Sequence, residues 1–96
     1  MTYFVYYLID PAAGVFYVGL TCIPEERRRA HQRGKCRSTK AKIKAMWAAG
    51  RRFEMVLFAG VPRKLDALRL ENTMIELTLG KLLNTPNSKH LVASLS

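Results

Sequence analysis

Two short runs of β-branched and aromatic residues near the N-terminus constrain the fold more than any other feature of the sequence. They cover residues 3–9 and 15–20, and their composition favours strands. The residues between them include a proline, which fixes φ, and a glycine, which permits positive φ. The pattern therefore predicts a β-hairpin. Because both alternating faces of the first run are apolar, we expect it to lie inside the sheet.

The rest of the sequence predicts one further strand and three helices. In chain order these are two short helices, a third strand and a long helix, at residues 24–34, 39–49, 53–59 and 64–83. Pro24 suits the first turn of a helix. In the second helix, Ile43, Met46 and Trp47 form an apolar stripe at helical spacing. The order β-β-α-α-β-α predicts an α+β fold with a small three-stranded antiparallel sheet flanked by helices.

The size and composition of the chain limit its organisation and location. Its 96 residues suffice for one modest core, so we expect a single domain over residues 1–96. No apolar run approaches the roughly 20 residues that span a bilayer, and the start lacks the features of a secretory signal. Two cysteines, Cys22 and Cys36, are too few for a disulfide framework. We expect both to be reduced and the protein to be cytoplasmic, with no membrane partner.

Positive charge is concentrated in one part of the chain. Between Arg27 and Arg52 there are eleven basic residues and no acid, in a protein of net charge +9. Such a stretch attracts polyanions, and phosphate contacts dominate non-specific affinity for nucleic acids. The alternatives are a solvated basic face and a patch for anionic membrane. We favour nucleic acid, and the residues predicted to contact it are Arg28, Arg29, Arg33, Lys35, Arg37, Lys40, Lys42 and Lys44.

The long C-terminal helix carries one carboxylate in an unusual position. Glu71 falls between two apolar sectors of the helix, where a helix packed on a sheet becomes buried. A carboxylate removed from water is costly unless it is paired, hydrogen-bonded or bound to a metal. Glu71 is therefore either the partner of a nearby arginine or a functional acid.

Two tripeptides in the predicted hairpin point to a known family. Phe-Val-Tyr at residues 4–6 and Tyr-Val-Gly at residues 17–19 resemble the paired triplets of the GIY-YIG nuclease superfamily. Further residues in the family's order and spacing strengthen the resemblance: Arg27, His31, Glu71 and Asn84. The one departure is Phe4, where the first triplet usually has glycine. The resemblance covers nearly the whole chain and implies a DNA endonuclease with a single divalent metal.

The resemblance also implies a role for each matched residue. Glu71 would hold Mg²⁺ or Mn²⁺ together with phosphate oxygens of the DNA, and Glu76 is a rival ligand. Arg27 would clamp a non-bridging phosphate oxygen, which its planar guanidinium suits. The remaining catalytic residues implied by the resemblance are Tyr6, Tyr17, His31 and Asn84.

The two tyrosines would flank the attacking water, and a phenol acts as a base there only if nearby cations favour phenolate. His31 would shuttle a proton or contact phosphate, and Asn84 would hold geometry. Gly19 would let the DNA backbone approach the second strand.

The hairpin register decides which tyrosine faces the site. Pairing Ile9 with Val15 in a regular ladder would place Tyr7, not Tyr6, opposite Tyr17. A bulge or a different loop would restore Tyr6. Following the resemblance, we choose Tyr6, with Tyr7 as the reserve.

Two other functions are consistent with the same sequence. The first is a catalytically weak or inert nucleic-acid-binding module on the same fold, and the second is a small basic protein of a ribonucleoprotein, with RNA as ligand. Glu71 favours the nuclease, since a carboxylate repels DNA unless a cation intervenes. Specificity would then come from the basic region, from DNA structure, from a homodimer or from a partner protein.

Overall fold

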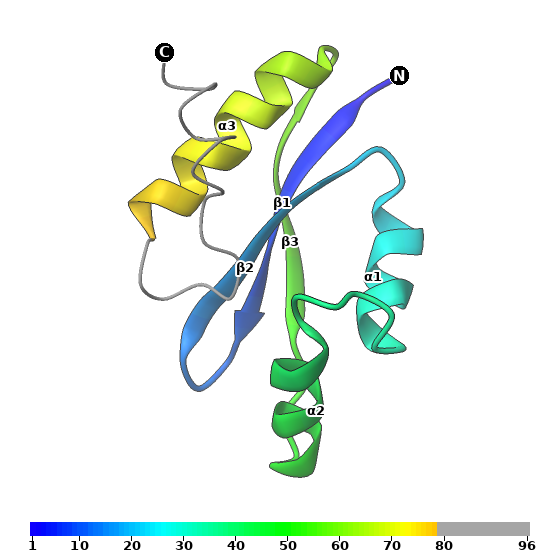
Figure 1. The fold of residues 1–96 in the computed structure, drawn as a ribbon, viewed down its shortest axis with the longest axis vertical. Helices are drawn as coiled ribbons and strands as arrows, with labels where there is room; N and C mark the ends of the chain where they lie inside the picture. The colour runs from blue at the N-terminus through cyan, green and yellow to red at the C-terminus, as the bar shows by residue number, and fades with distance from the viewer. Residues whose placement is uncertain (79–96) are drawn as a thin grey trace.

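The computed structural model describes residues 1–78, which form a three-stranded antiparallel sheet and three helices (Figure 1). The strands are β1 (Tyr3–Asp10), β2 (Gly14–Thr21) and β3 (Glu54–Val61), and the helices are α1 (Pro24–Gln32), α2 (Lys40–Ala48) and α3 (Lys64–Leu77). The strand order is β2-β1-β3, so β1 lies in the middle, as its two apolar faces predict. The predicted α+β class and the order of the elements are confirmed.

The described part of the last helix is α3, which ends at Leu77. Residues 79–83, which the apolar periodicity also assigns to this helix, lie outside the described residues. Thr78 donates its hydroxyl hydrogen to the carbonyl oxygen of Met74 at 2.8 Å. This bond satisfies one of the carbonyl groups that the end of a helix leaves without an intrahelical partner.

The hairpin between β1 and β2 contains a β-bulge. Near the turn Ile9 pairs with Val15, but the next pair joins Leu8 to Tyr17. Phe16 is therefore an extra residue in β2, and it is buried in the core. The bulge shifts the alternation of β2 by one residue from this point onward.

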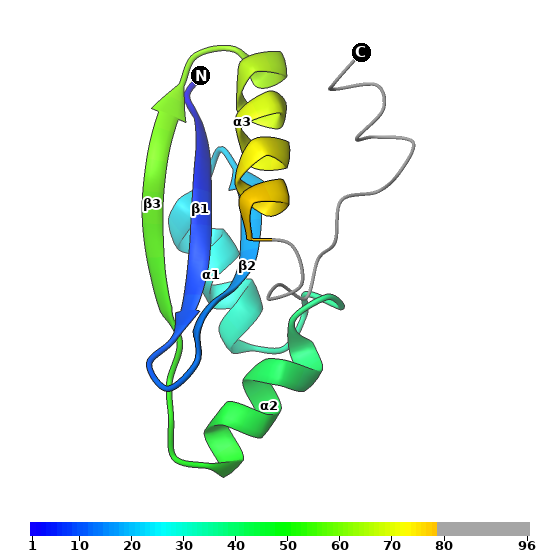
Figure 2. The same cartoon turned by 90° about the vertical axis from the view of Figure 1, so that its left-hand side faces the viewer.

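The two faces of the sheet contact different helices. One core packs under α2, and its buried members are Tyr6, Leu8, Phe16, Ile43 and Met46. The other packs under α3, and its buried members are Val5, Val18, Ala67 and Ile75. Figure 1 shows α3 and α1 on opposite sides of the sheet, and Figure 2 shows α2 at the end where the hairpin turns.

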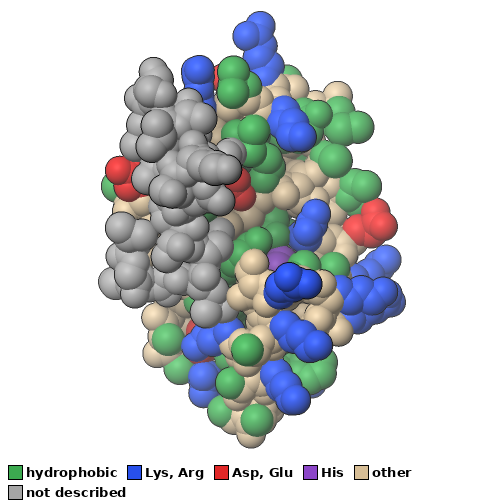
Figure 3. All heavy atoms as spheres, viewed as in Figure 1, with side chains coloured by type: hydrophobic (Ala, Val, Ile, Leu, Met, Phe, Trp, Pro, Cys, Tyr) green, Lys and Arg blue, Asp and Glu red, His purple; other side chains and the backbone are tan. Residues whose placement is uncertain are grey.

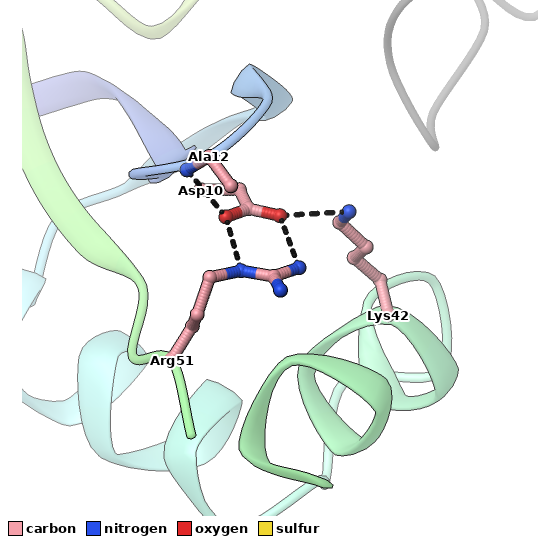
Figure 4. A network of polar contacts seen from close by, with 4 residues as sticks. All are labelled: Asp10, Ala12, Lys42 and Arg51. Atoms are coloured by element: carbon pink, nitrogen blue, oxygen red, sulfur yellow. Dashed lines mark hydrogen bonds and ion pairs between the residues drawn. The ribbon is translucent and has the colours of Figure 1, made fainter. Parts of the chain in front are cut away.

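A buried carboxylate joins the hairpin turn to α2 and to the segment before β3 (Figure 4). Asp10 is fully buried and accepts two hydrogen bonds from the Arg51 guanidinium, at 2.9 and 3.1 Å. Lys42 lies 2.9 Å away, and the backbone N–H of Ala12 donates at 2.9 Å. The Arg51 guanidinium, with these partners, holds the pKa of Asp10 well below its usual range. Lys42, which we predicted to contact DNA, thus forms an ion pair with Asp10.

Candidate active site

The bulge places Tyr6 and Tyr17 on the same face of the hairpin. Tyr17 pairs with Leu8, which lies two residues along β1 from Tyr6, so the two phenols are diagonal neighbours. Their ring centroids are 6.2 Å apart. Tyr7 belongs to the core on the opposite face. Of the two candidate tyrosines in β1, the structure brings Tyr6 to Tyr17.

Gly19 makes room for the ring of Tyr6. The two residues pair across the hairpin, and Gly19 is buried. A Cβ atom on Gly19 would overlap Cζ and Oη of Tyr6 and lie 2.7 Å from Cε1. The structure therefore gives this glycine a packing role that we did not anticipate, while its predicted role in DNA approach stays a prediction.

His31 is the third member of the buried cluster. Only 1% of its surface is exposed, although its neighbours Arg29 and Gln32 on α1 are exposed. Its Nε2 atom lies 2.8 Å from the hydroxyl oxygen of Tyr6. The imidazole also packs edge-on to Tyr17, with ring centroids 5.3 Å apart. The sequence predicts His31 as a site residue but gives no sign of this burial.

The other nitrogen of His31 is held by a residue that the sequence analysis missed. Nδ1 lies 2.7 Å from the hydroxyl oxygen of Thr39, which is fully buried. Thr39 stands at the N-cap of α2 but makes no side-chain cap bond there. An N-cap threonine usually accepts a bond from the amides of its own helix. This departure is visible only in the structure, so the sequence carries no signal that could have identified Thr39.

The contacts of Thr39 favour one tautomer of His31. The Thr39 hydroxyl can donate to the carbonyl oxygen of Cys36, 3.5 Å away, and then accepts from Nδ1–H. Nε2 is left without a proton and accepts the hydroxyl hydrogen of Tyr6. In this arrangement the Tyr6 oxygen keeps lone pairs that can accept a hydrogen bond, and the Tyr17 hydroxyl is hydrogen-bonded to Tyr6.

Burial keeps the His31 imidazole neutral. Burial, assisted by the positive charge of Arg27, lowers the pKa of His31 from 6.5 to about 4. The unfolded chain would bind a proton near pH 6.5, whereas the folded protein does so only near pH 4. His31 therefore lowers the stability of the fold as pH falls through this window.

We expect this shift to be visible by NMR. In a His90→Gln variant, which leaves His31 as the only histidine, the imidazole signal should titrate near pH 4. A midpoint close to 6.5 would mean that the ring is solvated and that the buried cluster is not formed. Replacing Thr39 by valine in the same variant removes the Nδ1 partner and serves as the comparison.

The two tyrosines are also neutral. Burial raises the pKa of Tyr6 and of Tyr17 above their ordinary value of 10. Arg27 acts in the opposite direction on both, but burial outweighs it. Arg27, the cation expected to favour phenolate, is thus close enough to act on both tyrosines, but its charge alone does not bring their pKa values below 10.

Arg27 stands at the edge of this cluster. It is exposed on α1, and its charge affects the pKa of Tyr6, Tyr17 and His31. A cleft of about 430 Å³ opens beside it, lined in part by Lys64 at the start of α3. Arg27 lines this cleft but Tyr6 and Tyr17 do not, so the cleft lies next to the cluster. Lys64 is a second cation there that the sequence analysis did not single out.

Glu71 brings a carboxylate from α3 into the electrostatic range of the same cluster. It is partly buried, and burial raises its pKa from 4.5 to about 7. Its negative charge in turn raises the pKa of Tyr17 and of Tyr6. Within residues 1–78, no arginine or lysine forms an ion pair with Glu71. The arginine partner that we considered is not present in that part of the chain. Glu76 is exposed.

The donor set suits a hydrated cation rather than a metal cage made of protein ligands. In the described part of the chain, no three His, Cys, Asp or Glu side chains are grouped so as to hold a metal. Glu71 offers a single carboxylate. Mg²⁺ commonly keeps several waters beside one or two carboxylates and substrate phosphates. A lone, partly buried carboxylate fits that chemistry.

Most of the predicted DNA-contacting side chains are exposed. Figure 3 shows Lys and Arg gathered over α1 and α2 on the face seen there. Arg28 is held by Glu25 at 2.8 Å, as Lys42 is held by Asp10. The predicted residues that are exposed and in no ion pair within residues 1–78 are Arg29, Arg33, Lys35, Arg37, Lys40 and Lys44. Asn84, predicted to hold the site's geometry, lies outside the described residues.

Over residues 1–78, no helix is long and apolar enough to cross a bilayer.

Comparison with known proteins agrees with the geometry. No match to the chain is found among curated proteins or among solved structures. The family model of the GIY-YIG catalytic domain matches residues 2–84. This match includes all six residues that the resemblance marked as catalytic, and the chain belongs to the GIY-YIG nuclease superfamily.

Proposed function

We propose that the protein is a metal-dependent endonuclease that hydrolyses phosphodiester bonds of DNA with a single Mg²⁺ or Mn²⁺ ion. One observation carries the proposal. Glu71, a partly buried carboxylate, lies within electrostatic range of Tyr6, whose hydroxyl is hydrogen-bonded to the buried His31. A protein that only binds DNA gains nothing from the carboxylate, because it repels phosphate. The cytoplasmic location, a homodimer and a specificity-giving partner stay predictions.

Glu71 is the residue that would hold the metal. When bound, the cation neutralises charge on the phosphate in the transition state and stabilises the leaving oxygen. Metal binding requires the deprotonated carboxylate. Since the pKa of Glu71 is about 7, we expect metal affinity to rise with pH through neutrality.

Tyr6 and His31 would handle the proton of the attacking water. The Tyr6 oxygen, whose hydrogen is donated to Nε2 of His31, would accept a hydrogen bond from the attacking water on a lone pair that Tyr17 leaves unused. As the water attacks, its proton passes to this oxygen while the phenol hydrogen moves to Nε2. This relay does not require phenolate in the resting enzyme, in agreement with the raised pKa of Tyr6.

Tyr17 and Arg27 complete the arrangement. Tyr17, whose ring lies 6.2 Å from that of Tyr6, would orient the water from the other side. Arg27 would bind a non-bridging oxygen of the scissile phosphate through its planar guanidinium. Both residues therefore fix the geometry of attack rather than transfer a proton.

The proposal is tested by incubating supercoiled plasmid with the purified protein in Mg²⁺, in Mn²⁺ and in chelator. We expect nicked or linear products in both metals and none in chelator. Gel retardation without cutting, on plasmid, branched and single-stranded DNA alike, would contradict the nuclease and favour a module that only binds nucleic acid. Cutting that is as fast in chelator would rule out the metal mechanism.

A further inference from the structure

A second concave surface lies between the end of α1 and α2. It is a groove of about 310 Å³ lined by Gln32, Arg33, Gly34, Lys40, Ile43, Lys44 and Trp47. Its volume is at the lower end of the range for small-ligand pockets, roughly 300–1,000 Å³. None of the lining side chains is acidic.

Trp47 presents an aromatic surface to this groove. The helical stripe predicts that it packs in the core, with base stacking by an exposed face as the alternative, and Ile43 and Met46 of the same stripe are buried. Trp47 nevertheless remains 48% exposed. The guanidinium carbon of Arg52 lies 5.0 Å from its ring centroid. Arg52 is not among the residues that line the groove, so this cation–π contact does not fill the groove.

Three cations surround the aromatic surface. Arg33, Lys40 and Lys44 line the groove, and within residues 1–78 none of them forms an ion pair. The amide of Gln32 adds a group that both donates and accepts hydrogen bonds. An aromatic face next to uncompensated cations matches a base joined to phosphates. An acidic peptide would use the cations but would leave the indole without a matching partner.

The groove adjoins the buried cluster of Tyr6, Tyr17 and His31. Gln32 directly follows His31, and Lys40 directly follows Thr39. The hydrogen bond of 2.7 Å between His31 and Thr39 joins the two helices at this point. A nucleic-acid strand that leaves the cluster over α1 and α2 therefore meets the groove next.

We propose that the groove binds an unpaired nucleotide of the DNA substrate, with its base stacked on Trp47 and its phosphates on Arg33, Lys40 and Lys44. The inference rests on the proposed function and adds the substrate class, which is DNA with unpaired nucleotides close to the cleavage point. A base inside a duplex is covered on both faces by its neighbours and must leave the stack before it can contact the indole.

Trp47 is the only tryptophan of the chain, so its fluorescence reports on the groove directly. The wild-type protein, kept in chelator to prevent cutting, is titrated with a short single-stranded oligonucleotide and with the blunt duplex of the same sequence. We expect the single strand to quench the fluorescence strongly and the duplex to quench it weakly. Equal quenching by both, or none by the single strand, overturns the proposal.

Variants separate stacking from general attraction. We expect Trp47→Ala to weaken single-strand binding about 10-fold or more, measured by anisotropy of labelled DNA, and to change duplex binding less than about 2-fold. Phe58→Ala is the matched control, because Phe58 is an aromatic residue of similar exposure, 46%, on β3. An equal loss for both DNA forms in Trp47→Ala would overturn the proposal.

These outcomes are independent of catalysis. Selective quenching without any metal-dependent cutting would support the groove and contradict the nuclease. Metal-dependent cutting without selective quenching would support the nuclease and contradict the proposed groove. Quenching by poly-glutamate that matches quenching by the oligonucleotide would assign the groove to an acidic protein partner, against the proposal.

Discussion

Replacing Glu71 by glutamine should lower metal-dependent DNA cleavage by roughly 10³-fold or more. The substitution keeps the size of the side chain but removes the charge that attracts the cation. Since no arginine or lysine within residues 1–78 is paired with Glu71, the fold loses no ion pair in that part of the chain. The neutral amide also avoids the cost of burying a charge. We therefore expect the melting temperature to be unchanged or slightly higher.

DNA binding in chelator provides the second readout for Glu71→Gln. If Glu71 faces the phosphate as proposed, removing its negative charge should leave DNA affinity equal or higher. Glu76→Gln is the matched control, because Glu76 is on the same helix and is exposed. If cleavage survives in Glu71→Gln and is lost in Glu76→Gln, the metal belongs to Glu76. If both variants cut like the wild type, neither carboxylate holds it.

Gly19→Ala should destabilise the protein and impair cleavage together. The added methyl group would overlap the ring of Tyr6, which is itself fully buried and cannot move into solvent. Overpacking of this kind costs about 1–3 kcal/mol, and each kcal/mol lowers the melting temperature of a domain this size by roughly 4–8 °C. Displacing the ring also breaks the hydrogen bond between Tyr6 and His31. We expect thermal denaturation and the cleavage assay to show both losses.

Two further variants test the cause of the Gly19 effect. Gly60→Ala places a methyl group in β3 at 3.0 and 3.2 Å from Phe4, a milder contact, and should have a smaller effect on both readouts. In a Tyr6→Val background, where the ring is absent, Gly19→Ala should cost much less stability than it does alone. Additive losses in that double variant would show that Gly19 serves a purpose other than accommodating Tyr6.

The sequence predicts the fold well because its signals are local. Apolar runs, a proline and glycines mark the strands and helices, and the middle position of β1 follows from its two apolar faces. The register does not follow, because the bulge at Phe16 depends on packing across the sheet. Periodicity with an ideal ladder places Tyr7 opposite Tyr17, and only the family resemblance pointed to Tyr6.

The environment of the site residues depends on contacts that are distant in sequence. His31 is predicted as a site residue, yet its burial comes from Tyr6 and Thr39, which approach from β1 and α2. Trp47 shares the spacing of two core residues but stays half exposed, since periodicity defines a face and not where the core ends. The raised pKa of Glu71 likewise reflects burial that charge counting does not reveal.

The buried Asp10 at the hairpin turn has a consequence for ionic strength. Of the eleven cations between Arg27 and Arg52, it engages Lys42 and Arg51, and Glu25 engages Arg28, which leaves eight for phosphate. On duplex DNA, log K falls with log[salt] by about 0.9 per phosphate contact. This stretch can therefore contribute a slope no steeper than about −7, instead of the −10 or so that eleven contacts would give. Asp10 accounts for two of the three engaged cations, so a carboxylate that holds the turn against α2 would also make DNA affinity less dependent on salt.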